Sequence, residues 1–288
     1  IFPVMLKLHG NILPENVPSN EFMNLEGDKM STSRGWSIEM DEYINDFVKK
    51  ENGGDMMVDA LRYYLTAIAP ETKDSEFTWK DYQAKNNNEL VAIFGNFVNR
   101  AVVLTQKNFE NKVPVCGPLQ DADRQVLDEI AQAPGRIAEA LEAYKFREAT
   151  AALIDLARSG NKYLADTEPW KLAKTDMPRV GTILNIALQL AATLAIVSEP
   201  FLPKTSGKLH QMLGTKALPW SSAGKTSLLE AGQQLGQVSL LFQKIEDDVI
   251  ESQRQKLINR SAALTAPLSS VPEAKAQVQF DNFSKMDI

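Results

Sequence analysis

The run Gly181–Ser198 most constrains the fold of this chain, because it contains no charged residue and is apolar nearly all round. A helix of this kind must be buried, either in the core of a protein or in a bilayer. Polar residues interrupt the run at Thr182, Asn185, Gln189 and Thr193, and neither a basic cluster nor an aromatic belt flanks it. The sequence therefore favours the central helix of a helical bundle and argues against a membrane partner.

Apolar residues at three- and four-residue spacing predict further helices around this run. We expect helices at residues 38–48, 56–69, 81–109, 120–142, 146–165, 178–198, 204–213 and 242–264, with an irregular stretch at 214–232. The later helices, four or five of them antiparallel with short links, make a bundle. Residues 1–35 are instead rich in loop signals, and short apolar runs predict strands at Met5–Leu8 and Phe22–Leu25.

The chain therefore divides into three parts. The fold class is mainly α, with a small α/β region at residues 1–79 followed by an antiparallel helical bundle at 80–264. Residues 265–279 contain two prolines and predict a linker, and the alternating run Phe280–Ile288 is typical of the first strand of a further domain. Both ends of the sequence look like those of a piece cut from a longer protein.

Composition limits the kinds of site that the chain can hold. The single cysteine, Cys116, excludes an internal disulfide and a Cys-rich zinc site, and His9 and His210 are too far apart in sequence to suggest a His-based one, so no metal site is expected. The 288 residues carry a net charge of −6, which argues against broad binding to a nucleic-acid backbone. A net charge averages over faces, however, so a few residues could still read unstacked bases.

The segment Gly27–Gly35, with the sequence Gly-Asp-Lys-Met-Ser-Thr-Ser-Arg-Gly, has the composition of an anion-binding loop. Hydroxyl groups, backbone N–H groups and two cations lie between glycines that allow tight turns. Such a loop could receive a chain of phosphates. On composition alone a solvated turn explains the same residues.

Two further pairs of residues could contact single-stranded RNA. Asn96 and Arg100 lie four apart, so they share one face of a helix near solvent, where an amide and a guanidinium suit base edges and a phosphate. Pro169 and Trp170 follow a predicted cap at Thr167, and a tryptophan at a helix start can stack on a base. The simpler alternatives are an ordinary surface pair and a tryptophan packed between helices.

The order of residues in the loop favours the functional interpretations over the simpler ones. Lys29–Ser33 closely resembles the Lys-Met-Ser-Lys-Ser signature of class I aminoacyl-tRNA synthetases, and Leu8–Gly10, the helix around Tyr43 and Asp59–Leu65 sit where that class has similar segments. Within the class, the chain is most similar to the methionyl-tRNA synthetase family. The resemblance covers nearly the whole chain and is least specific at 214–260.

The resemblance implies roles for particular residues. It makes Lys29, Ser31, Thr32, Ser33 and Arg34 catalytic, with Lys29 and Thr32 at the phosphates of ATP. The second signature lysine is Thr32 in this chain, which can donate a hydrogen bond but supplies no charge, so Lys29 is the expected phosphate contact and Arg34 a partial substitute.

At the bundle, the resemblance implies that the anticodon is read by Asn96, Arg100, Pro169 and Trp170.

The resemblance also implies a function for the parent protein. That function is a cytoplasmic methionine–tRNA ligase that uses ATP, Mg²⁺ and methionine and recognises tRNA(Met) through its CAU anticodon. Residues 1–79 would be the end of a Rossmann-type catalytic domain. Residues 265–288 would be a linker and the start of an appended OB-type tRNA-binding domain, through which the parent could form a homodimer. The nucleotide-binding half and any zinc site would precede Ile1, so we expect the chain alone to be inactive. The alternative is a non-catalytic helical module that binds RNA or protein.

Overall fold

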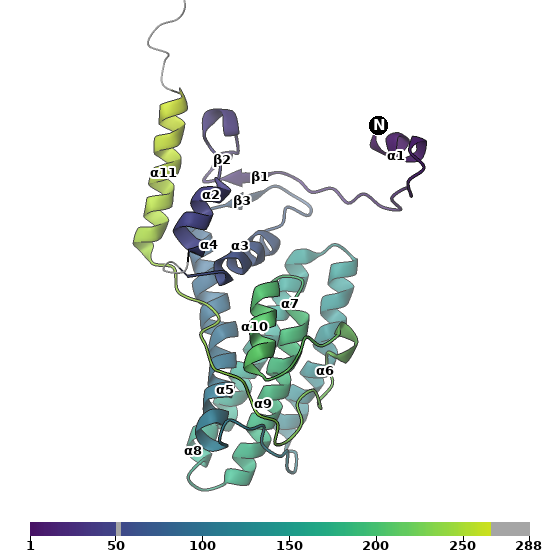
Figure 1. Ribbon diagram of the computed structural model, residues 1–288, viewed down its shortest axis with the longest axis vertical. Coiled ribbons are helices and arrows are strands. Elements are labelled where there is room, and N and C mark those ends of the chain that lie inside the picture. Colours follow the sequence, from purple (N-terminus) through teal and green to yellow (C-terminus); the bar gives the residue numbers. More distant parts are fainter. Residues whose placement is uncertain (50–52, 266–288) are drawn as a thin grey trace, which may run out of the picture.

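The computed structural model describes residues 1–49 and 53–265, and these residues form an elongated, mostly helical molecule (Figure 1). A helical bundle occupies one end and a small sheet with its surrounding helices the other. The bundle contains α4 (Trp79–Lys85), a π-helical stretch (Asn86–Gly95), α5 (Asn96–Asn108), α6 (Asp121–Glu142), α7 (Phe146–Thr167), α8 (Pro169–Leu172), α9 (Met177–Val197) and α10 (Pro203–Met212).

Helix α9 is the centre of the bundle, as its uncharged sequence predicts. It packs against α5, α6, α7, α8 and α10, and every residue from Val180 to Val197 is buried. Among the described residues it is the one helix long and apolar enough to cross a bilayer, and its apolar window lies wholly inside the bundle.

The two amide side chains of α9 bond to loop backbone. Asn185 donates to the Pro114 carbonyl at 2.8 Å, and Gln189 donates to the Leu229 carbonyl at 2.8 Å. These bonds hold two loops against the core and remove the cost of burying the amides.

The small sheet has the strand order β2-β1-β3. Strand β1 (Met23–Leu25) pairs antiparallel with β2 (Asp28–Lys29) and parallel with β3 (Ser75–Phe77). The remaining elements at this end are α2 (Met40–Tyr43), a π-helical turn (Ile44–Val48), α3 (Met56–Ala67) and α11 (Asp247–Thr265). A buried cluster of aromatic rings joins them to the first helix of the bundle, and its members are Tyr43, Phe47, Tyr64, Phe77, Trp79 and Tyr82.

The prediction of a strand at Met5–Leu8 is wrong, because these residues belong to helix α1 (Phe2–Leu8). In the described part of the chain no strand lies beside this segment, and a helix satisfies its own backbone hydrogen bonds where a lone strand cannot. Pro3 in the first turn suits a helix start. The helix stands apart from the rest of the molecule, and none of its residues is buried (Figure 1).

The last helix begins later than the predicted 242–264. The backbone before it stays irregular because two asparagines of the π-helical stretch bond to it. Asn86 donates to the Gln243 carbonyl at 2.9 Å, and Asn87 both donates to and accepts from the Ile245 backbone. The prediction of one long helix at 81–109 is confirmed, with the π-helical stretch inside it. The predicted strand Phe280–Ile288, and all but the first residue of the linker, lie outside the described residues.

Candidate functional site

The loop singled out in the sequence forms two successive turns. Strands β1 and β2 meet at a tight turn, in which Gly27 has φ 84°. Beyond β2, Ser31 and Trp36 exchange backbone hydrogen bonds of 2.8 and 2.9 Å, which closes the base of a second turn. The tip of that turn, Thr32–Arg34, is a single 3-10 turn exposed to solvent. We call Asp28–Gly35 the signature loop.

Polar and charged groups gather on the signature loop. Arg34 donates to the Asp28 carboxylate at 3.1 Å and to the Lys29 carbonyl at 3.0 Å, so its guanidinium lies beside β2. The Lys29 amide and then Arg34 hold the pKa of the Asp28 carboxyl below its usual value. The hydroxyls of Ser31 and Ser33 lie 3.1 Å apart. Two cations and several hydroxyls on one exposed loop suit binding of an anion.

The second candidate site lies at the far end of the bundle, where α8 meets α5. The Cζ atom of Arg100 lies 4.9 Å from the ring centroid of Trp170. Trp170 is 38% exposed, whereas Pro169 is buried at the start of α8. Asn96, one turn before Arg100, is exposed and donates to Asn161 of α7 at 3.2 Å. The structure thus brings the predicted residues of both segments to one surface, which we call the Arg100–Trp170 platform.

Local sequence explains why the platform forms. Glu168 ends α7 in the left-handed conformation, with φ 43°, and Pro169 then starts α8, so the chain reverses sharply before Trp170. Gly160 allows α7 to approach α5 closely, because a Cβ atom there would lie 2.5 Å from the Phe97 ring. These two features set the spacing across which Arg100 and Trp170 meet.

Two family models match the chain. The family model described as "tRNA synthetases class I (M)" matches residues 1–102, and that of the "Anticodon binding domain of methionyl tRNA ligase" matches residues 113–262, just over half of the chain. The chain belongs to the methionyl-tRNA ligase family.

Members of this family from several bacteria are similar to the whole chain. It is 56% identical over 289 aligned residues to the methionine–tRNA ligase of Bacteroides fragilis and 57% identical to that of Parabacteroides distasonis, covering 100% of this chain and 42% of each relative. Methionyl-tRNA synthetase of Mycobacterium tuberculosis, solved in its apo form and with methionyl-adenylate, has the same fold, with TM-scores of 0.70 and 0.72 at 21% and 24% identity. These alignments cover 85% and 84% of this chain and 47% and 46% of the solved ones. The chain spans less than half the length of these ligases.

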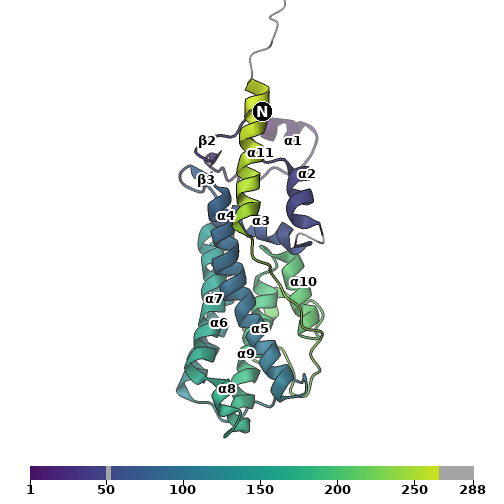
Figure 2. The same ribbon diagram turned by 90° about the vertical axis from the view of Figure 1, so that its left-hand side faces the viewer.

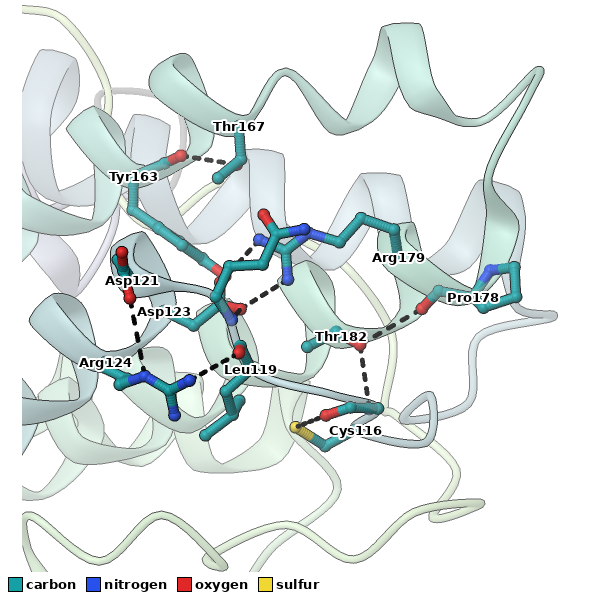
Figure 3. A network of polar contacts seen from close by, with 12 residues as sticks. Cys116, Leu119, Asp121, Asp123, Arg124, Tyr163, Thr167, Pro178, Arg179 and Thr182 are labelled. Atoms are coloured by element: carbon teal, nitrogen blue, oxygen red, sulfur yellow. Dashed lines mark hydrogen bonds and ion pairs between the residues drawn. The ribbon is translucent and has the colours of Figure 1, made fainter.

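Near the platform of this ligase-family chain lies a buried polar network that sequence reasoning missed (Figure 3). The guanidinium of Arg179, on α9, donates to both carboxylate oxygens of Asp123, on α6, at 2.5 and 2.8 Å. The Tyr163 hydroxyl, on α7, donates to the same carboxylate at 2.6 Å, and the backbone N–H of Gln120 donates to it at 2.8 Å. One fully buried carboxylate therefore joins three helices.

Burial would raise the pKa of the Asp123 carboxyl, but hydrogen bonds from Arg179, Gln120 and Tyr163 outweigh it and hold that pKa below the usual value. Helix α7 connects this network to the platform. The Thr167 hydroxyl, at the end of α7 and just before α8 begins, donates to the carbonyl of Tyr163 at 2.6 Å. The one sequence signal was the position of Asp123, three residues after Gln120, where it completes a capping box at the start of α6.

Proposed function

We propose that this chain is the part of a methionine–tRNA ligase that supplies the ATP-step loop and the anticodon-binding bundle. In the parent reaction, methionine and MgATP form methionyl-adenylate and pyrophosphate, and methionine then passes to tRNA(Met). The observation that carries the proposal is the Arg100–Trp170 platform, which exposes part of an indole ring beside a guanidinium. Trp170 lies within the residues matched by the anticodon-binding model, and Arg100 lies within those matched by the synthetase model. That pairing suits a base with its phosphate.

Residues 1–79 would be the end of a Rossmann-type catalytic domain, and residues 80–264 the anticodon-binding domain. The surface of the first part supports this division. Large apolar side chains that a soluble core would normally cover are exposed there, namely Phe2, Val4, Met5, Leu8, Ile12, Val17 and Phe22. Exposed apolar side chains concentrated in one segment are typical of an interface, and a nucleotide-binding half is the partner that the family would place on it.

At the signature loop, Lys29 would contact the phosphates of ATP, with hydrogen bonds from the hydroxyls of Ser31, Thr32 and Ser33. Arg34 would supply the second positive charge that Thr32 lacks. Its guanidinium already lies on the loop, and its ion pair with Asp28 is exposed at both partners, so an incoming phosphate could replace that carboxylate. These groups would stabilise charge that develops when the carboxylate of methionine attacks the α-phosphate.

At the platform, Trp170 would stack on an anticodon base while Arg100 and Asn96 contact a phosphate and base edges. Pro169 would fix the start of α8. Recognition of CAU, and a homodimer through a further C-terminal domain, are parts of the proposal that rest on the family resemblance.

Binding of RNA stem-loops to this chain tests the proposal. We expect a stem-loop with the CAU anticodon to bind at least tenfold more tightly than the same stem-loop with an unrelated anticodon, measured by fluorescence titration at fixed salt. Equal affinity for both would favour a general RNA-binding module. Pyrophosphate exchange by the chain alone should show no methionine-dependent turnover.

A further inference from the structure

We propose that Arg260, on the last helix, is a positioning residue that holds the base of the signature loop for the ATP step. The inference rests on the proposed function of that loop. Helix α11 lies far from the loop in sequence, yet it runs alongside the sheet and α2 (Figures 1 and 2). The contacts between them are specific and lie at the point where the loop ends.

The guanidinium of Arg260 joins three groups just beyond the loop. It donates to the Ser37 carbonyl at 2.7 Å, pairs with the Glu42 carboxylate and lies 3.6 Å from the Glu39 carboxylate. Glu39 in turn accepts a hydrogen bond from the Ser37 hydroxyl at 2.7 Å. One side chain of α11 thus connects the segment that leaves the loop to α2, the first helix after it.

Arg260 is 21% exposed, so these bonds are partly shielded from water. Charge-assisted hydrogen bonds of a shielded guanidinium are stronger than those of a solvated surface pair. The contact is therefore suited to fixing a position.

Gly35 shows how closely the two segments meet. Its φ is +66°, and a Cβ atom there would lie 2.9 Å from Leu264 Cδ1 and 3.1 Å from the backbone carbon of Arg260. The base of the loop therefore rests on the backbone of α11. On the other side, the indole of Trp36 donates to the Leu25 carbonyl at 2.6 Å. The base is held from both sides, while the tip remains exposed.

Three further contacts fix α11 itself. Gln253 and Lys256 bond to the Asp46 carboxylate at 2.7 and 2.5 Å, and Arg254 lies 3.5 Å from Glu26, in the turn between β1 and β2. A helix attached at several points cannot move without moving the base of the loop. Since an error of about 1 Å in placing a catalytic group can cost about 100-fold in rate, this attachment bears on the ATP step.

Hydrogen exchange on this chain tests the attachment directly. In Arg260→Ala, the amides of Ser31 and Trp36, which bond across the base of the loop, should exchange about tenfold faster. The matched control is Asn259→Ala, since Asn259 is exposed on the same helix and bonds to Gln255. Unchanged exchange in a folded Arg260→Ala chain would overturn the proposal.

Kinetics of the full-length ligase containing this chain separate positioning from folding. Arg260→Ala should lower kcat for pyrophosphate exchange by about 10- to 100-fold, with the KM for methionine and the affinity for the CAU stem-loop unchanged. Arg260→Glu should be worse, and adding Glu42→Arg should recover part of the loss. No recovery in the double variant would contradict the ion pair as the cause.

The Lys29→Ala variant of the full-length ligase tests the role of the signature loop separately from the positioning role of Arg260. Loss of exchange in Lys29→Ala with normal kcat in Arg260→Ala would refute only the positioning role. Normal exchange in Lys29→Ala would instead refute the proposed function of the signature loop, and the hydrogen-exchange result would still report on the attachment.

Discussion

Arg100 and Trp170 come from different helices of the bundle, and the guanidinium carbon of one lies 4.9 Å from the ring centroid of the other. A cation over an indole face contributes about 0.5–1 kcal/mol at an exposed site. The contact therefore orients both side chains before any ligand arrives. A platform that is ordered in advance loses less entropy when it binds a base.

Trp170→Ala should weaken binding of the CAU stem-loop by about 1–3 kcal/mol, because a stacking surface is lost. Trp170→Phe should retain part of that affinity. Fluorescence titration of the three proteins at one salt concentration measures the effect. Since Trp170 is 38% exposed, the free energy of unfolding should change little, and a large change would show that the ring instead supports the fold.

Arg100→Gln should reduce the salt dependence of the same affinity. If the guanidinium neutralises one phosphate, the slope of log K against log salt should become shallower by about 0.7. Titrations of the wild type and the variant at three salt concentrations give the two slopes. An unchanged slope with a lower affinity would mean that Arg100 reads a base edge and not a phosphate.

Arg179→Met should destabilise the bundle by about 3–5 kcal/mol, because it leaves the buried Asp123 carboxylate without its main partner. Urea unfolding followed by circular dichroism measures the change. The double variant Arg179→Met with Asp123→Leu should be much less destabilised, since it removes both charges. Similar losses in the two variants would show that the unpaired charge of Asp123 is not the main cause of the destabilisation.

The lowered pKa of the Asp123 carboxyl also predicts how the free energy of unfolding depends on pH. Because its pKa is lower in the folded chain, the folded state binds fewer protons than the unfolded state in acid. Its contribution is fully present above the unfolded pKa of about 3.9 and is lost as the pH falls through the folded value. Unfolding free energies at pH 7 and pH 3 should therefore differ more in the wild type than in the double variant.

Much of the helical fold could be predicted from the sequence, because apolar spacing is a local property. Helix α9 is uncharged and central, and the bounds of α6 and α7 lie within two residues of those expected. The error at α1 has a physical cause: a short apolar run suits either a strand or a helix, and only the presence of a partner strand decides.

The features that could not be predicted from the sequence depend on contacts between residues far apart in the chain. The late start of α11 follows from side chains of Asn86 and Asn87 that bond to its approach. The network of Asp123 and Arg179 joins three helices, and no spacing rule connects them. Arg100 and Trp170 were each singled out by motif, but their contact follows from the turn at Glu168 and became visible only in three dimensions.

The π-helical stretch Asn86–Gly95 should tolerate changes in length better than α5, the part of the same long helix that carries Arg100. Wide turns hold more residues than α-helical turns, so a deletion within this stretch can be absorbed by tightening the coil. Deletion of one residue in α5 before Arg100 would instead rotate the residues beyond it by about 100° and carry Arg100 away from Trp170. Natural insertions and deletions in this helix should therefore concentrate between residues 86 and 95.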